Sequence, residues 1–344
     1  MCETLHRINY CNANALRNVD NESVHLVVTS PPYPMIAMWD AMFCSQNDSI
    51  AQHLRNQRGM AAFESMHKIL DGVWREVDRI LVPGGLCCIN IGDATRTIDR
   101  NFCLYPNNQR VTECFIKQGH TALPPILWRK VTNTPNKFMG SGMMPPGAYV
   151  TLEHEWILIF RKGRKREFRT AAEKANRRES AYFWEERNQW FTDLWKLQGT
   201  PQRISNHNTR ARSAAFPFEI PYRLINMFSV KGDVVYDPFL GTGTTTVAAI
   251  ACERHSIGAD IDEGLREVSM DRIVNMSVRD YRTLLDDRIA RHNEFVGSYG
   301  KPMKYFNSRY NTPCVTRNEE YMRWNIIDHV EVTQSGFVAH YVEY

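Results

Sequence analysis

Short apolar runs alternate with longer amphipathic stretches along most of the chain. Residues 23–30 (SVHLVVTS) and 86–93 (LCCINIGD) are nearly continuous apolar runs. Such runs are typical of strands that are buried on both faces of a sheet. Between them, residues 61–80 carry apolar side chains at helical spacing, and this pattern predicts a helix that stops at Pro83-Gly84-Gly85.

The same alternation returns later in the chain. Residues 121–130 and 151–163 predict two more strands, and residues 217–229 predict an amphipathic helix. Residues 233–262 then run as strand, Gly/Thr-rich turn, helix and strand. Because a βαβ unit joins parallel strands, the pattern predicts an α/β fold. Residues 279–297 predict a helix, and the C-terminal residues after it predict short strands.

The composition is that of an ordinary globular protein. Apolar residues make up 43% and charged residues 23% of the 344 residues. No run reaches the roughly 18 apolar residues that a membrane helix needs, and the N-terminus lacks the pattern of a signal peptide. We therefore expect a cytoplasmic protein without membrane contact.

Cysteine and histidine spacing predicts no metal site. None of the nine cysteines forms a C-x-x-C pair, and the eleven histidines form no H-E-x-x-H motif. We therefore expect reduced thiols, as in a cytoplasmic protein. Cys87 and Cys88 are adjacent in a predicted strand, so their side chains should face opposite sides of the sheet.

Positive charge is concentrated in one segment. The net charge is only +4, but residues 161–178 hold nine Lys/Arg against two Glu. Such a density is typical of a surface that binds a polyanion. The alternative is a solvated, charged surface helix or loop.

The Gly/Thr-rich turn is a candidate ligand site. Gly241 and Gly243 follow a predicted strand and precede a helix, where glycine lets a ligand approach the backbone and the helix start offers free N–H groups. Asp260 ends the next strand, the usual place for an acid that binds ribose hydroxyls. The third glycine of a dinucleotide motif and the lysine of a P-loop are both missing. The alternative is a tight turn without a ligand.

A second candidate motif is TSPPYP, Thr29 to Pro34, at the end of the first apolar run. Two consecutive prolines stop a strand, because proline lacks the N–H that the ladder needs. By itself the motif is compatible with a plain strand-ending turn.

Together, DPFLGTGTT (residues 237–245) and TSPPY (residues 29–33) resemble two motifs of the DNA amino-methyltransferases. The catalytic motif precedes the cofactor motif, as in the β class of that family. Lesser similarities include LVPGG, ILWRK, EHEWILIFRKG and AAFPFEIPYRLI, and the resemblance runs over most of residues 5–270. It implies a Rossmann-like methyltransferase core: a mostly parallel, twisted sheet with helices on both faces, plus an inserted target-recognition region.

The resemblance also implies a cofactor, S-adenosylmethionine, and the residues that bind it. The cofactor-binding residues are expected to be Asn12, Phe216, Pro217, Asp237, Pro238, Phe239, Gly241, Gly243, Thr244, Asp260 and Ile261. Asn12 stands where the family usually has an Asp near the adenine amine, and its carbonyl can accept the same hydrogen bond.

The catalytic residues implied by the resemblance are Ser30, Pro31, Pro32 and Tyr33. The Pro31 carbonyl and the Ser30 hydroxyl would accept hydrogen bonds from an exocyclic amine, and Tyr33 would stack on the base after it has left the helix. In the family, Ser at the first position is associated with cytosine N4 and Asp or Asn with adenine N6. We therefore expect a site-specific cytosine-N4 methyltransferase that uses direct in-line transfer, with adenine N6 as the alternative.

By position, residues 161–200 would be the target-recognition region between a catalytic half (residues 1–160) and a cofactor half (residues 201–275), followed by an extension of unknown role (276–344). Within that region, the expected DNA-binding residues are Arg164, Lys165, Arg166 and Arg169. Residues 34–62 predict either a loop that closes over flipped DNA or a helix packed on the sheet.

The implied partner is double-stranded DNA in the nucleoid of a prokaryotic cell. The resemblance allows a cognate restriction endonuclease as a functional partner, and either a monomer or a homodimer. Two other functions remain open: a nicotinamide dehydrogenase, which the missing third glycine disfavours, and a DNA-binding protein with a vestigial cofactor pocket, which the intact TSPPY motif disfavours.

Overall fold

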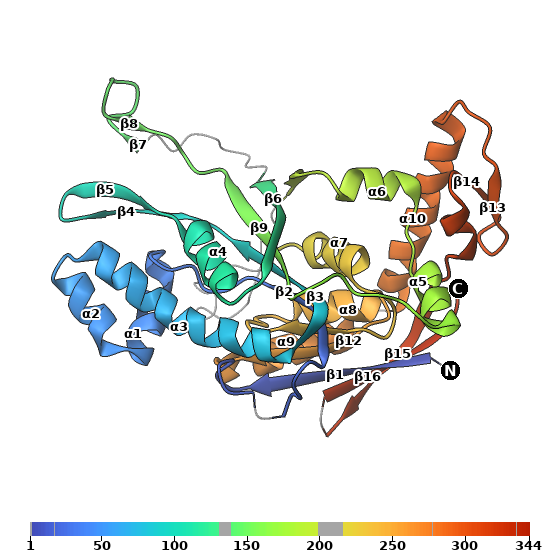
Figure 1. Ribbon diagram of the computed structural model, residues 1–344, viewed down its shortest axis with the longest axis horizontal. Coiled ribbons are helices and arrows are strands. Elements are labelled where there is room, and N and C mark those ends of the chain that lie inside the picture. The colour runs from blue at the N-terminus through green and yellow to red at the C-terminus, as the bar shows by residue number, and fades with distance from the viewer. Residues whose placement is uncertain (1, 17, 131–138, 199–215, 277, 335) are drawn as a thin grey trace.

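The computed structural model describes the chain apart from residues 1, 17, 131–138, 199–215, 277 and 335. One sheet of ten strands forms its centre (Figure 1). In spatial order the strands are β10 (Leu194–Leu197), β6 (Thr121–Lys130), β9 (His154–Arg161), β3 (Leu81–Ile91), β2 (Val24–Thr29), β11 (Val234–Asp237), β12 (His255–Asp260), β1 (Cys2–Tyr10), β16 (Gly336–Glu343) and β15 (Asn325–Thr333).

Strand direction divides this sheet into a parallel centre and antiparallel flanks. Strands β3, β2, β11, β12 and β1 are parallel neighbours, so their carboxyl ends meet at one edge, which we call the carboxyl edge. Strand β9 is antiparallel to both β3 and β6, so it ends at the opposite, amino edge. Strands β16 and β15 add an antiparallel pair beside β1. The predicted α/β fold with a parallel core is confirmed.

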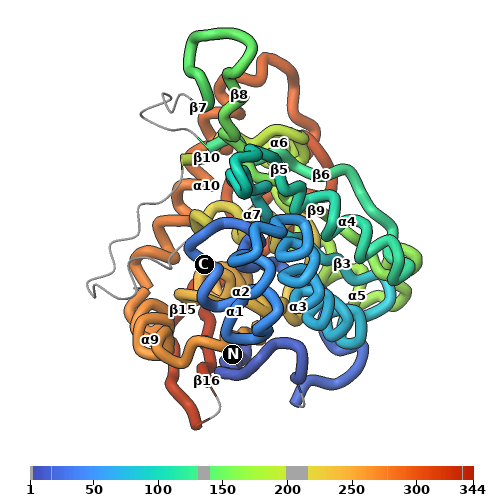
Figure 2. The backbone as a smooth tube through the Cα atoms, turned by 90° about the vertical axis from the view of Figure 1, so that its left-hand side faces the viewer, coloured from blue at the N-terminus to red at the C-terminus, as the bar shows by residue number. Residues whose placement is uncertain are grey.

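Helices cover both faces of the sheet (Figures 1 and 2). The α-helices are α1 (Asp40–Gln46), α2 (Asp48–Arg55), α3 (Gly59–Ile80), α4 (Asn107–Lys117), α5 (Ala171–Glu179), α6 (Trp184–Trp190), α7 (Glu219–Phe228), α8 (Thr244–Ala251), α9 (Arg266–Asn275) and α10 (Val278–Ser298). Short 3-10 helices are η1 (Ala37–Trp39), η2 (Glu263–Leu265) and η3 (Arg317–Tyr321).

Two apolar cores result, one on each face of the sheet. Helices α3 and α4 pack on one face, and α7 and α8 pack on the other. Cys87 belongs to the first core and Cys88 to the second, so the prediction that they face opposite sides is confirmed. Burial of these two layers of aliphatic and aromatic side chains is the main force that orders the sheet.

The helix predicted at residues 61–80 is α3, which begins two residues earlier and ends at Ile80. The chain then enters β3 directly. The pairing of β3 with β2 is irregular between Leu81 and Leu86. The Pro-Gly-Gly turn lies in this irregular stretch, and Gly84 has a φ of +86° there. Residues 37–55 form η1, α1 and α2, and α1 and α2 pack mainly against each other and against α3. The segment is therefore helical, but its main contacts are with α3 and not with the sheet.

The described residues 161–198 pack onto the same body as the sheet. Strand β10 extends the central sheet beside β6, and Phe183, Trp190 and Trp195 are buried. The C-terminal extension also belongs to the same body, because β15 and β16 join the sheet. Strand β13 (Tyr305–Asn307) pairs with β14 (Thr312–Cys314), and η3 contacts α5. A further apolar cluster joins Leu285 of α10 to Phe183, Tyr310, Met322 and Trp324.

Two hairpins extend from the carboxyl edge. They are β4 (Ala94–Ile98) with β5 (Asn101–Tyr105), and β7 (Met139–Gly140) with β8 (Ala148–Tyr149), at the left of Figure 1. Within the described residues, no helix has the length and apolar character that a bilayer crossing requires.

Candidate active site

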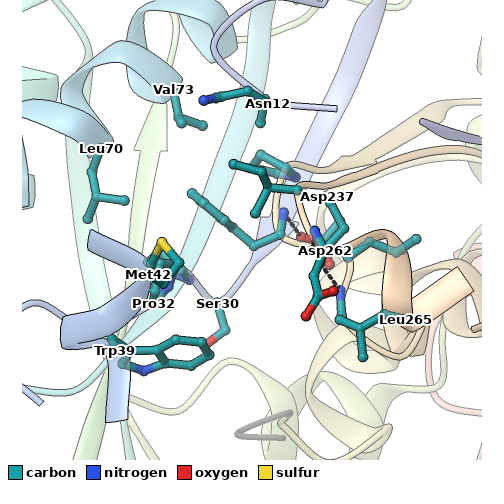
Figure 3. A pocket seen from close by; sticks show the side chains of 18 of the residues that line it. Asn12, Ser30, Pro32, Trp39, Met42, Leu70, Val73, Asp237, Asp262 and Leu265 are labelled. Carbon is teal, nitrogen blue, oxygen red and sulfur yellow. Dashed lines mark hydrogen bonds between the residues drawn. The ribbon is translucent and has the colours of Figure 1, made fainter. Parts of the chain in front are cut away.

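A cavity of about 480 Å³ lies at the carboxyl edge of the sheet, where β2 and β11 end (Figure 3). Because these two strands are hydrogen-bonded neighbours, TSPPY and DPFLGTGTT come together although they are far apart in sequence. The cavity is lined by all four predicted catalytic residues and by most of the predicted cofactor residues. The cofactor residues in contact with it are Asn12, Phe216, Asp237, Pro238, Phe239, Gly241, Thr244, Asp260 and Ile261.

Asp237 joins the two motifs. Its carboxylate accepts a hydrogen bond of 2.6 Å from the Thr29 hydroxyl, one of 2.6 Å from the Thr245 hydroxyl, and one of 3.0 Å from the Phe239 N–H. The side chain is buried, and burial raises its pKa to about 6, although these three donors act in the opposite direction. At neutral pH the cavity therefore contains a buried negative charge.

Asp260 shapes the glycine turn. One carboxylate oxygen accepts the Gly241 N–H at 2.8 Å, and the other accepts the Asp262 N–H at 2.9 Å. Gly241 has a φ of +55° and Gly243 a φ of +81°, a backbone conformation that other residues adopt only with strain. Burial raises the pKa of Asp260 as well. The carboxylate thus fixes the loop that forms one wall of the cavity.

Thr244 lies at the first turn of α8 and lines the cavity. Its hydroxyl is buried and has no hydrogen-bond partner among the described residues. A buried polar group without a partner costs free energy, so its presence in a cavity points to a ligand that supplies the partner.

The catalytic turn rests on a polar network. The Tyr33 hydroxyl donates to Glu155 at 2.8 Å and lies 3.1 Å from the Ser30 hydroxyl. The Asn90 amide donates to Tyr33 at 2.8 Å and to Glu155 at 2.6 Å, and Lys130 forms an ion pair with Glu155. Burial and the nearby Glu155 charge raise the pKa of Tyr33 well above its ordinary value, so the hydroxyl stays protonated.

The opposite wall of the cavity is apolar. Trp39 of η1, Met42 of α1, and Leu70 and Val73 of α3 line it, and Figure 3 shows these side chains across from Asp237 and Asp262. Trp39 is half-buried and lines the same cavity as Ser30 and Pro32.

Two predicted cofactor residues do not line the cavity. Gly243 is the N-cap of α8 and packs toward Ile273, and Pro217 is buried next to Phe216. The sequence reasoning missed Asn90, Glu155, Lys130 and the apolar wall. Glu155 and Lys130 fall within segments that carry the family resemblance, but nothing in their spacing assigns them a role.

The four predicted DNA-binding residues lie at the amino edge, away from the cavity. Arg166 forms an ion pair with Asp233, the residue before β11, and Arg169 forms one with Glu167. Arg164 and Lys165 are exposed in the loop after β9. Because β9 runs antiparallel to β3, this loop leaves the sheet at the end opposite to TSPPY. The four predicted DNA-binding residues are therefore not beside the catalytic turn.

Three side chains of the described residues could in principle gather around a metal ion: Glu185, His292 and Glu319. His292 uses both ring nitrogens, one toward Glu185 at 2.8 Å and one toward the Pro313 carbonyl at 2.9 Å. Burial by itself acts to lower the pKa of His292. The hydrogen bonds to Cys314, Glu185 and Pro313, together with the Glu185 charge, outweigh burial and raise the pKa to about 10. A protonated imidazole is no metal ligand, so we interpret this group as a structural ion pair.

Comparison with known proteins agrees with this geometry. Residues 24–271 match the family model described as DNA methylase. The chain is 49% identical to the type II methyltransferase M.MthZI of Methanothermobacter thermautotrophicus over 93% of this chain and 90% of that protein. It is 48% identical to M.MjaI of Methanocaldococcus jannaschii over 78% and 91%, respectively.

Similarity also extends to a solved structure. The protein TTHA0409 of Thermus thermophilus, in complex with S-adenosyl-L-methionine, aligns with a TM-score of 0.60 and 30% identity. The alignment covers 78% of this chain and 95% of that chain.

Proposed function

Because this chain belongs to the DNA methylase family, which makes it an S-adenosylmethionine-dependent DNA amino-methyltransferase, we propose that it methylates the N4 amine of cytosine in a specific duplex sequence. The observation that supports cytosine is Ser30 at the first position of the catalytic turn, where its hydroxyl borders the cavity. Adenine N6 is the alternative, and it would use the same residues.

The cavity fits S-adenosylmethionine. Its described lining contains three carboxylates, from Asp237, Asp260 and Asp262, and no Lys or Arg, which suits a cationic ligand. The glycine turn and the unpartnered Thr244 hydroxyl offer polar contacts, and Leu70 and Val73 offer an apolar wall. When bound, this cofactor supplies an electrophilic methyl group on a positively charged sulfur.

The catalytic turn would hold the amine. The lone pair of an exocyclic amine is delocalised into its ring, so acceptors that hold the amine protons help the nitrogen to become tetrahedral. Ser30 and the Pro31 carbonyl can act in this way because two prolines stiffen the turn and Tyr33 anchors it from behind. The amine loses one proton in the reaction, and the line of hydroxyls from Ser30 through Tyr33 leads to the Glu155 carboxylate.

A supporting role for Tyr33 fits its surroundings better than base stacking. Its hydroxyl is bound in the network and the residue is only 7% exposed, so little of it is free to stack on a base. Trp39 offers an aromatic side chain at the same cavity and is half-buried. We therefore assign base stacking to Trp39, and the support of Ser30 to Tyr33.

The target duplex would lie on the carboxyl edge. Arg129 and Lys130 end β6 at this edge, and the β4–β5 and β7–β8 hairpins extend from it (Figure 1). They replace Arg164, Lys165, Arg166 and Arg169 as the expected target-recognition surface, because a base must leave its helix next to the cavity to enter it.

Mass spectrometry of nucleosides tests this proposal. Mixed-sequence duplex DNA is incubated with the protein and S-adenosylmethionine and then digested, with the Asp237→Ala variant as the control. N4-methylcytosine is the expected product. N6-methyladenine would refute the choice of base and leave the site assignments in place. Cofactor binding without any methylated nucleoside would favour a DNA-binding protein with a vestigial pocket.

A further inference from the structure

A second large cavity, of about 930 Å³, lies on the side of the molecule away from the candidate active site. It is formed by the loop after β9, by α5 and the start of α6, and by the end of α7. Its described lining contains seven Lys/Arg and no Asp or Glu. We call it the basic cleft, and its cations are Arg161, Lys165, Arg166, Lys174, Arg177, Arg178 and Arg187.

Within the described part of the chain, most of these charges have no carboxylate partner. Arg166 is held by Asp233, but no ion pair is formed by Lys165, Lys174 or Arg177 with any described residue. Arg177 instead lies over the Phe168 ring at 4.9 Å.

The nearby acids face elsewhere. Glu173 caps the N-terminus of α5 through the Thr170 N–H, and Glu186 is paired with Arg288 in the interior. Apart from Arg166, the cations of the cleft therefore form no ion pair with a carboxylate among the residues that the structure describes.

Helix α5 places Lys174, Arg177 and Arg178 three and four residues apart, so like charges are neighbours on one surface. Such neighbours repel and destabilise a helix by a few tenths of a kcal/mol per pair. A polyanion in the cleft would remove this repulsion. Arginine forks and lysine ammonium groups are the side chains that bind phosphate oxygens, and Tyr182, Trp184 and Asn188 add polar and aromatic contacts.

The cleft is too far from the catalytic turn to serve the target base. His25, near the start of β2, lines the cleft, and β2 ends at Thr29, directly before Ser30. At about 3.3 Å per residue, the five residues from His25 to Ser30 span roughly 16 Å, and the sheet separates the two sites. The cleft and the carboxyl edge thus face different directions, with α5 at the right and the hairpins at the left of Figure 1.

We propose that the basic cleft binds the sugar–phosphate backbone of a second DNA segment, outside the duplex that presents the target base. The proposal rests on the DNA substrate of the family and not on the choice of cytosine. A long DNA molecule supplies such a segment at high local concentration once one site is occupied. The cleft would therefore increase affinity for long DNA without contributing to sequence recognition.

The test compares the full-length protein with two triple variants. The first, Lys174→Gln/Arg177→Gln/Arg178→Gln, removes three exposed charges from the cleft. The matched control, Arg279→Gln/Arg291→Gln/Lys301→Gln, removes three exposed charges outside both cavities. Glutamine keeps helix propensity, and thermal unfolding confirms that each variant is folded.

Fluorescence anisotropy then measures binding to a methylation site placed in duplexes of about 16 and about 60 base pairs over a range of salt concentrations. Near 0.1 M salt, the cleft variant should bind the long duplex at least about 10-fold more weakly than the parent protein. The slope of log affinity against log salt concentration should become less steep by about 2.7, which is about 0.9 for each of three lost phosphate contacts. Binding and methylation of the short duplex should not change, and the control should resemble the parent protein.

Three results would overturn the proposal. An equal loss on both duplexes would make the cleft part of the target interface. An equal loss in the control variant would reduce the effect to net charge. Unchanged binding to both duplexes would show that DNA does not occupy the cleft, and an acidic protein surface would then be the ligand to examine. Because binding is measured separately from the methylated base, failure here leaves the cytosine proposal untouched.

Discussion

Asp237→Asn should make the protein more stable and its cofactor binding weaker. The substitution removes a charge and keeps the shape of the side chain. The Asn oxygen can still accept from Thr29 and the Phe239 N–H, which both bind Oδ1. The new amide can donate to the Thr245 hydroxyl, whose own proton can turn to the Val28 carbonyl, 3.4 Å away. Thr29, Thr245 and the Phe239 N–H therefore each keep a hydrogen-bond partner.

The pKa of Asp237 gives the magnitude of the stability effect. Burial raises it from 3.8 to about 6, a shift that corresponds to about 3 kcal/mol at 1.36 kcal/mol per unit. A carboxyl group with a raised pKa stabilises the fold in acid, where it is protonated, and loses this contribution as the pH rises from about 4 to about 6. Asparagine has no such loss. The free energy of unfolding of the variant should therefore exceed that of the parent by up to about 3 kcal/mol above pH 6.

Differential scanning fluorimetry at a series of pH values measures this difference. The Tm of the variant minus that of the parent should rise between pH 4 and 6 and then remain constant at about 2–6 °C. Other carboxyl groups titrate in both proteins and cancel in the difference. Calorimetry at pH 7.5 should show S-adenosylmethionine affinity reduced at least about 10-fold, because the buried negative charge is gone. A Tm difference that does not depend on pH, or a less stable variant, would refute the reasoning.

Two further predictions concern the network behind the catalytic turn and the docking of the C-terminal extension. Tyr33→Phe and Glu155→Gln should each reduce turnover at saturating cofactor by about 10-fold or more and leave cofactor affinity nearly unchanged. The reason is that Tyr33 contacts Ser30 and Glu155 holds Tyr33. Full activity of either variant in a single-turnover assay would remove that residue from the mechanism. Arg288→Met should lower the free energy of unfolding by about 3–5 kcal/mol, because it leaves Glu186 buried without its partner at 2.6 Å. Denaturant titration measures this free energy of unfolding. Adding Glu186→Gln to Arg288→Met should restore part of the lost stability. A loss below about 1 kcal/mol for Arg288→Met alone would contradict the prediction.

The position of the candidate site could be predicted from the sequence, because both motifs directly follow apolar strand-like runs. Parallel strands bring such turns to the same edge, and β2 and β11 are in fact neighbours. The glycine turn, Asp237 and Asp260 were therefore found at the cavity without any knowledge of the sheet order. Gly243 lies in the glycine turn and Pro217 in AAFPFEIPYRLI, but neither lines the cavity, a detail of packing that a motif does not contain.

The direction of β9 could not be predicted, and it decides where the basic segment lies. An apolar run such as WILIF reads the same for a parallel and an antiparallel strand. Its antiparallel pairing with β3 and β6 sends residues 161–178 to the amino edge and brings His154 and Glu155 to the carboxyl edge. The same reversal explains why Glu155 was missed, and why Arg164, Lys165, Arg166 and Arg169 lie at the edge opposite the catalytic turn.

The geometry of Asp237 couples the two halves of the candidate site. One carboxylate oxygen holds Thr29, the residue directly before Ser30, and the other holds Thr245 in the first turn of α8. These bonds join the end of β2 to the first turn of α8, and the Thr245 hydroxyl also lies 3.4 Å from the Val28 carbonyl. On the other side, Tyr33 and Glu155 tie the same turn to β9. Ser30 therefore lies between two buried carboxylates on separate strands, which accounts for its fixed position relative to the cavity.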